Sequence, residues 1–302
     1  MSAITFPMEK RMPLPPDILS LLTHFARHME GGIRIELIRY LAGAGGVAAL
    51  LWLGGRGLAH RKIQTRTASR IDVAREVRQS LWTIVVFAVV DLLTVALIVG
   101  GVIAMAHGPA RVATIVWQVI ALIVLHDAWF YWMHRALHTR ALFRLTHLAH
   151  HRSRTPTSWA AYSFATGEAV CEALVIPAMF LIVAAIAPVE PLAVFIFLGH
   201  QIARNAIGHS GHELAWSGFT RSPLTAWLTT TTHHDLHHSE GRYNYGLYFT
   251  WWDRWMGTEH PRYHDRFEAV ATRTRKKAGA ATREFISQGI APQDLAPQNL
   301  TP

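Results

Sequence analysis

The sequence has almost no cysteine. Cys171 is the only one, and it stands inside an apolar run. A single thiol excludes an internal disulfide, a cysteine-based zinc site and a bound iron–sulfur cluster. It also excludes haem attachment through the C-x-x-C-H motif. Without thiolates, the soft-ligand classes of metal site are not available to this chain.

Charge is scarce as well. Charged residues make up 16% of the sequence and hydrophobic residues 51%, whereas average soluble domains carry about 25% charged residues. The mean hydropathy is positive, at +0.18, which indicates a membrane protein. The net charge of +9 does not indicate nucleic-acid binding, because the basic residues cluster beside apolar spans, as in the cytoplasmic loops of membrane proteins.

The apolar stretches predict an all-α integral membrane protein with about four transmembrane passes. The clearest stretch, 80–106, exceeds a ~30 Å hydrocarbon core at about 1.5 Å per residue. We expect a structural role for Asp91, the acid inside it. Stretches 169–187 and 192–207 form either two short passes or a re-entrant hairpin. The remaining predicted spans are 35–58 and 112–133.

A basic loop after the first span predicts the orientation of the chain. By the positive-inside rule such a loop faces the cytoplasm. The span 112–133 returns the chain to that same side, where the histidine motifs begin. The basic residues of this loop are Arg61, Lys62, Arg66, Arg70, Arg75 and Arg78.

Histidine is abundant and clustered. Thirteen of the nineteen histidines lie between His126 and His238. One H-x-x-x-H motif and two H-x-x-H-H motifs stand there, and His209 stands alone. Residues three and four apart share a helix face, so each H-x-x-H-H is expected to direct three imidazoles at one place. The motif histidines are His134 and His138; His147, His150 and His151; and His234, His237 and His238.

These motifs predict metal binding, and their number favours two ions. Eight imidazoles exceed the three or four protein ligands of a typical single zinc site. The sequence has no H-E-x-x-H, which argues against a zincin protease. It has no Glu-x-x-His pair, which argues against a carboxylate-bridged ferritin-type site. An all-histidine site with open positions suits iron that binds dioxygen and attacks an unactivated C–H bond, but the ligands alone leave zinc hydrolysis open.

The three motifs, in this order, resemble the fatty acid hydroxylase/sterol desaturase superfamily of integral membrane non-haem di-iron oxygenases. Neighbouring residues strengthen the resemblance, which runs from about residue 70 to 260. They are His126-Asp127 followed by Phe130-Tyr131-Trp132 and His134-Arg135; Gly208-His209-Ser210-Gly211; and Asn244-Tyr245-Gly246 followed by Trp252-Asp253-Arg254 and Gly257-Thr258.

The resemblance implies that all eight motif histidines ligate two non-haem iron ions, for which zinc can substitute. His209 matches an additional family histidine and is also expected to be a ligand, and His212 is a weaker candidate. We expect supporting roles around the metal for His126, His233 and Asn244. Asp127, Asp235 and Asp253 are expected to accept the second ring N–H of ligating histidines. For Asp253, capping a helix or pairing with Arg254 is an equal alternative. For Asn244, the alternative role is to fix the turn before Gly246.

The resemblance also implies an apolar lipid substrate that enters from the bilayer, and O2 as co-substrate. Trp159, Tyr162, Phe164 and Trp227 are candidates to line its pocket. Because the chain shows no nucleotide fingerprint and no redox cofactor motif, the electrons must come from an external donor, such as a ferredoxin or a cytochrome with its reductase.

The predicted function is therefore O2-dependent hydroxylation or desaturation of a membrane lipid, an oxidoreductase activity. Two alternatives are a zinc-dependent membrane hydrolase and a non-catalytic membrane protein that binds metal or haem. The predicted organisation has three parts: an N-terminal interfacial segment (1–34), a membrane-embedded catalytic domain (35–258) with its histidine-rich cap on the cytoplasmic side, and a basic cytoplasmic tail (259–302).

Overall fold

The computed structural model describes residues 18–273, and helices account for its regular structure. Within that range no strand forms, and β-pairing is confined to three isolated bridges. Four helices are long and apolar enough to cross a membrane. The structure therefore fits the predicted all-α membrane protein. These four candidates are Leu22–Arg61, Arg70–Val99, Val112–Leu137 and Thr166–Ala184.

The first candidate is one long, bent helical segment. A π-helical turn in its middle brings Gly43 against Ile202, and a Cβ at this glycine would lie 2.3 Å from Ile202 Cγ1. This is the close packing that glycines in a membrane helix permit. The segment consists of α1 (Ile18–Tyr40), the π-turn η1 (Leu41–Gly45), α2 (Gly46–Leu58) and the 3₁₀ turn η2 (Ala59–Arg61).

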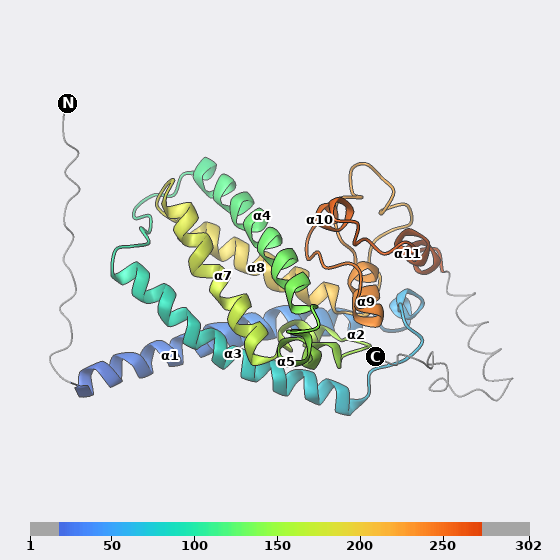
Figure 1. Cartoon of the computed structure of the whole chain (residues 1–302), viewed down its shortest axis with the longest axis horizontal. Coiled ribbons are helices and arrows are strands. Elements are labelled where there is room, and N and C mark those ends of the chain that lie inside the picture. The colour runs from blue at the N-terminus through green and yellow to red at the C-terminus, as the bar shows by residue number, and fades with distance from the viewer. Residues whose placement is uncertain (1–17, 274–302) are drawn as a thin grey trace.

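The next helices form the rest of the apolar body. Ser69 and Asp72 start α3 with a capping box, in which each side chain accepts a hydrogen bond from the other residue's backbone N–H. A buried core lies between α4, α7 and α8 (Figure 1) and includes Leu122, Met179 and Phe197. The bounds are α3 (Arg70–Val99), α4 (Val112–Leu137), α7 (Thr166–Ala184) and α8 (Pro191–Gly208).

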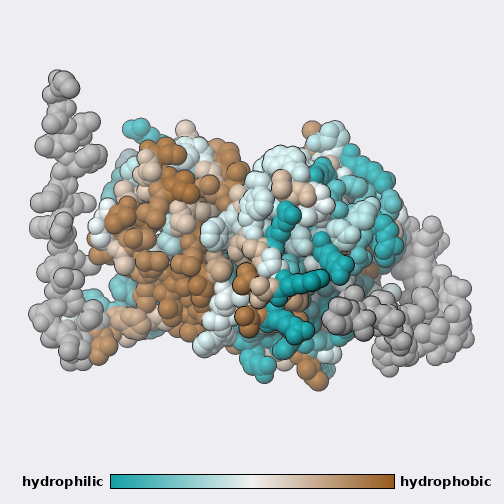
Figure 2. All heavy atoms as spheres, in the orientation of Figure 1, coloured by the Kyte–Doolittle hydropathy of each residue, from teal (hydrophilic) through white to brown (hydrophobic). Residues whose placement is uncertain are grey.

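Short helices gather at one end of this body. In Figure 1, α9, α10 and α11 lie beside one end of α4 and α8, and Figure 2 shows that this end is hydrophilic while the other half of the same face is apolar. The basic loop contacts this end, because Gln64 Nε2 donates to the carbonyl of Arg154 and to Asp235. These elements are α5 (Phe143–Thr146), α6 (Leu148–His151), η3 (Ser158–Tyr162), α9 (Thr231–Glu240), α10 (Trp251–Trp255) and α11 (Tyr263–Ala271).

Both boundaries of the predicted organisation fall inside folded structure. The boundary at 34/35 lies within α1, which is continuous from Ile18. After residue 259, α11 packs Tyr263 and Phe267 against Leu236 of α9. The first part of the predicted tail therefore belongs to the histidine-bearing end, because its aromatic face covers α9. Residues 1–17 and 274–302 lie outside the described residues.

Candidate metal centre

Helix α9 is polar in sequence but buried in the fold. Every residue from Thr231 to His238 is buried. The helix begins at Thr230, whose hydroxyl accepts from the N–H of His233, and it ends at Gly241 with φ 68°. Burying an imidazole costs free energy unless its nitrogens find hydrogen-bond partners or a metal ion. The four buried histidines of this short, well-capped helix therefore need such partners.

The histidines converge in two groups, within each of which the candidate ligand atoms all lie within 4.8 Å of one another. We call them the first group and the second group. Together they contain all nine residues expected to be ligands, and no carboxylate or thiolate. The first group is His134, His138, His147, His151 and His237, and the second is His150, His209, His234 and His238.

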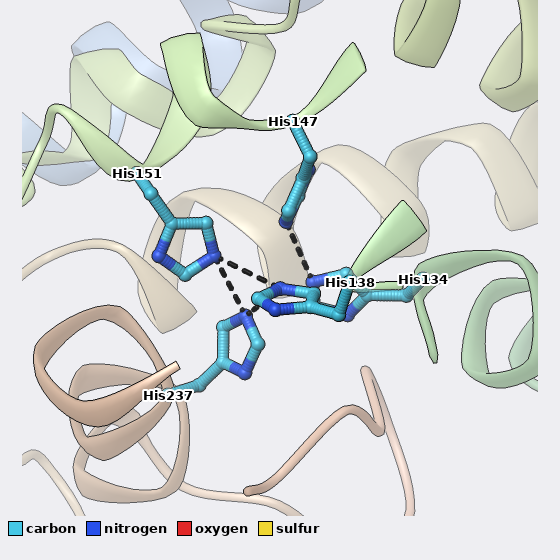
Figure 3. Close-up of side chains that lie close together, drawn as sticks. All are labelled: His134, His138, His147, His151 and His237. Atoms are coloured by element: carbon cyan, nitrogen blue, oxygen red, sulfur yellow. Dashed lines mark hydrogen bonds between the residues drawn. The ribbon is translucent and has the colours of Figure 1, made fainter. Parts of the chain in front are cut away.

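In the first group, rings from three segments of the chain face a common centre (Figure 3). The Nε2 of His151 lies 3.1 Å from that of His138 and 3.0 Å from that of His237. The Nε2 atoms of His134 and His147 are 3.0 Å apart. Imidazole nitrogens bound at about 2.1 Å to one ion and at right angles stand ~3 Å apart. The spacing thus fits a first-row transition metal.

The second group is built in the same way. His209 caps the C-terminus of α8, and its Nε2 lies 2.9 Å from that of His234 and 3.3 Å from that of His150. The two groups adjoin, since the ring centroids of His151 and His238 are 5.1 Å apart. The centre therefore presents two neighbouring groups of ring nitrogens, each of which could hold one metal ion.

The structure corrects one expectation about the H-x-x-H-H motifs. Neither motif directs all three imidazoles at one place. In the first motif, His147 and His151 join the first group and His150 the second; in the other, His234 and His238 join the second group and His237 the first. On a helix, positions i and i+4 are about 40° apart around the axis, but i+3 and i+4 are about 100° apart. Each motif therefore contributes to both groups.

Backbone carbonyls hold the outer nitrogens of several rings. The Nδ1 of His134 lies 3.0 Å from the carbonyl oxygen of Tyr245, and that of His237 lies 2.7 Å from the carbonyl oxygen of Tyr243. The Nδ1 atoms of His150 and His209 face the carbonyls of Ser163 and Asn205 at 3.1 and 2.9 Å. A ring that donates its Nδ1–H outward presents an Nε2 lone pair inward.

Burial keeps these rings neutral. It lowers the pKa of His150, His151 and His234 well below the usual value, and the neighbouring histidines lower these pKa values further. Burial likewise lowers the pKa of His209 to about 4. Because only a neutral imidazole has a lone pair to donate, the groups are ready to bind metal at neutral pH.

The predicted supporting aspartates are placed differently from the expectation. Asp127 accepts from the backbone N–H of Tyr248 and of Phe249, and from the indole of Trp251. Asp235 accepts from Gln64. Neither accepts a ring N–H of a candidate ligand. The reason is geometric: backbone carbonyls already face the rings, while these carboxylates tie distant segments together.

Asp253 acts on the centre through a loop. It accepts the backbone N–H groups of Tyr245 and Gly246 at 2.9 and 2.8 Å, and its carboxylate lies 3.3 Å from His233 Nε2. It makes no ion pair with Arg254, which pairs with Glu259 instead. The loop that Asp253 holds carries the carbonyls that face His134 and His237.

Asn244 fixes the same loop. Its φ of 59° is the one positive value among the described non-glycine residues. Its amide donates to the carbonyl of His233 and accepts from the N–H of His260, so it holds the turn before Gly246.

We expect Asn244→Ala to lower the free energy of unfolding by about 2–4 kcal/mol, through two lost buried hydrogen bonds and a strained backbone. Asn244→Gly should cost less, because glycine tolerates the backbone conformation. Thermal unfolding of both variants in detergent checks this ranking, and equal losses would contradict it.

The other predicted residues lie outside both groups. His212 contacts the carbonyl of Ser210 and lines a pocket of about 140 Å³ with Gln64 and Asp235. His126 is fully buried and stacks on Tyr248.

The residues predicted to line a lipid pocket are placed as follows. Tyr162 is a core residue whose hydroxyl donates to Glu36. Trp159 packs on the same core and Trp227 packs on Phe249, whereas the Phe164 ring is 5.4 Å from that of His150.

Comparison with known proteins supplies the family. Residues 119–258 match the model of the fatty acid hydroxylase family. This segment, 140 of the 302 residues, is therefore similar to the fatty acid hydroxylase/sterol desaturase superfamily. All nine histidines of the two groups fall within the matched segment.

Curated relatives from this superfamily are sterol enzymes. A methylsterol monooxygenase of Aspergillus fumigatus is 30% identical over 49% of this chain and 49% of the relative. A lathosterol oxidase of Mus musculus is 32% identical over 48% and 46%. A Delta(7)-sterol 5(6)-desaturase of Gibberella zeae is 27% identical over 62% and 56%. The chain thus spans about half the length of the curated relatives it matches. No solved structure matches it significantly.

Sequence reasoning missed two features of the centre. One is the set of carbonyls that hold the rings, which have no sequence signal because every residue carries one. The other is Glu168, whose Oε1 lies 2.9 Å from His147 Nδ1. The available signal was an acid at the edge of an apolar stretch, where a charge is costly and usually has a specific role.

Proposed function

We propose that this protein is an O2-dependent membrane oxygenase that uses two iron ions to hydroxylate or desaturate an unactivated C–H bond of a lipid. The observation that carries this proposal is the pair of adjoining all-histidine groups at the end of an apolar helical body. The superfamily match and the sterol oxidases and desaturases among the relatives support it.

The proposed ligands are the five histidines of the first group for one iron and the four of the second for the other. When bound, the iron pair would supply the reductive activation of dioxygen and the oxidation of the C–H bond. The protein's own part is to keep the imidazoles neutral by burial and to orient them through Nδ1 contacts. Neutral nitrogen ligands without thiolate or carboxylate are compatible with iron and also with zinc.

The substrate in this proposal is an apolar lipid, as the names of the relatives suggest. It reaches the centre from the bilayer, because the centre lies at the ends of helices long enough to span the membrane. The oxidation consumes electrons that no cofactor motif of this chain supplies, so a ferredoxin or a cytochrome with its reductase would deliver them.

We also propose that the histidine centre faces the cytoplasm. The basic loop contacts the segments that carry the motifs, since Arg75 donates to the carbonyl of Arg152 and Gln64 reaches Asp235 of α9. By the positive-inside rule, this side of the membrane is cytoplasmic. A cysteine introduced in the loop should react with an impermeant thiol reagent only after the membrane of intact cells is opened.

The proposed function is tested by metal analysis of protein purified anaerobically in mild detergent. We expect about two iron ions per chain, and oxygen consumption when a reductant and a sterol-like lipid are supplied. Two zinc ions under iron-replete growth, with turnover in the absence of oxygen, would support a hydrolase instead. A Soret band would indicate haem, and no metal in a folded sample would refute the proposal.

A further inference from the structure

His147 differs from its neighbours in what holds its outer nitrogen. Its Nδ1 lies 2.9 Å from Oε1 of Glu168, and the two side chains are 1% and 4% exposed. The rings of His134, His150 and His237 face backbone carbonyls instead. Among residues 18–273, no other histidine of the two groups pairs with a carboxylate.

The start of α7 is packed so that Glu168 reaches this ring. Trp82 Nε1 donates to the hydroxyl of Thr166 at 3.0 Å and fixes the first turn of the helix. At the next residue, a Cβ added to Gly167 would lie 3.0 Å from Cγ2 of Thr146. Glycine therefore lets α7 approach the residue before His147 more closely than a side chain would allow.

We propose that Glu168 is a positioning residue for the metal of the first group. Its carboxylate oxygen lies 2.9 Å from the Nδ1 of His147 and so favours the ring orientation in which Nε2 faces the other four histidines. This inference rests on the proposed metal binding. It adds that the two metal positions are unequal, because among the described residues only the first group has a carboxylate partner.

Glu172 provides a matched control. It lies one turn further along α7, it is also buried, and its Oε1 has no hydrogen-bond partner within the described part of the chain. It pairs with no histidine of either group. Replacing Glu172 thus makes the same chemical change in the same helix without touching a proposed ligand.

The test compares Glu168→Gln, Glu168→Leu, Glu172→Gln and Glu172→Leu. Each purified protein is titrated anaerobically with Fe²⁺, and with Co²⁺ as a spectroscopic probe. We expect the affinity of one of the two sites to fall ~10-fold in Glu168→Gln, which keeps an acceptor oxygen, and ~100-fold in Glu168→Leu. The Mössbauer lines or cobalt bands of that site should shift, while the other site and both Glu172 variants keep the values of the original protein.

A second pair of variants tests the geometry without changing the carboxylate. Gly167→Ala should push α7 away from Thr146 and weaken the same site. Adding Thr146→Ser, which removes the crowded methyl group and keeps the hydroxyl, should restore it. Such a rescue separates a specific loss of positioning from general unfolding.

The outcomes distinguish this inference from the proposed function. If the original protein binds no metal, the proposed function fails. If it binds two ions and Glu168→Leu binds them with unchanged affinity and spectra, only the role of Glu168 is overturned. Equal losses in Glu168→Leu and Glu172→Leu would also overturn it, because the effect would then come from altered burial in α7.

Discussion

Replacing His237 with alanine is expected to remove the metal of the first group and to reduce lipid oxidation more than 100-fold. The Nε2 of His237 lies 3.1 Å from that of His138 and 3.0 Å from that of His151, so this ring joins ligands from two other segments. Loss of a supporting partner typically costs 10–100-fold in affinity or activity, and loss of a direct ligand should cost more. Metal analysis and lipid product analysis measure the two effects.

Two further variants make this prediction specific. His234→Ala should remove the metal of the second group instead, which a cobalt spectrum can distinguish because the two proposed sites would differ in ligand number. His212→Ala should keep both ions, because His212 belongs to neither group. Loss of metal in His212→Ala, or retention of both ions in His237→Ala, would contradict the assignment of the groups.

Replacing Asp253 with alanine should be the most destabilising change away from the metal ligands. The carboxylate is fully buried beside His233 and accepts from Tyr245, Gly246 and Thr258. Its removal leaves three donors without their acceptor, and a buried donor left unsatisfied costs about 1–3 kcal/mol. The freed loop should also release the carbonyls that face His134 and His237. We therefore expect a lower free energy of unfolding and loss of metal from the first group.

Asp265→Ala is the control for this change. Asp265 pairs with Arg221 at 2.8 Å, but both side chains are largely exposed, so its removal should cost less than about 1 kcal/mol. Chemical unfolding in detergent with both variants checks the difference. If Asp253→Ala unfolds like Asp265→Ala and retains both metals, the loop does not position the ligands.

The pKa of Asp253 gives the pH dependence of this effect. Burial would raise that pKa, but the hydrogen bond and charge of His233, with hydrogen bonds from Thr258 and Gly246, hold it below its usual value. A pKa that is lower in the folded state stabilises the fold above pH ~4, and this stabilisation is lost as the pH falls further. The stability gap between the original protein and Asp253→Ala should therefore narrow below pH ~4.

Much of the fold followed from composition and hydropathy. The predicted spans 80–106 and 112–133 correspond to α3 and α4, because a run of apolar residues long enough for a membrane forms a helix regardless of its neighbours. The first span was less well placed. Arg34 and Glu36 interrupt the apolar pattern, so the start of α1 looked like a separate segment, but Glu36 is buried where Tyr162 donates to it.

The predicted C-terminal tail shows a similar limit of prediction from sequence. The stretch after residue 259 is polar in sequence and reads as a tail. Only its packing reveals that Tyr263 and Phe267 cover Leu236 on α9. A short amphipathic helix carries too few apolar residues to be separated from a flexible segment until the surface it covers is known.

The sequence by itself determined the chemistry of the centre: eight histidines at helical spacings, with His209 and only one cysteine in the chain, favour imidazole ligands and resemble one superfamily. Only the tertiary structure decided how these rings divide into two groups and what holds each of them. The division depends on the 100° between successive positions on α6 and α9 and on how these helices face each other. The supporting contacts join residues far apart in the chain, such as His134 and Tyr245, 111 positions apart. Their partners are backbone carbonyls and one buried glutamate, which local patterns do not mark, because any residue carries a carbonyl and only packing brings the right one to a ring.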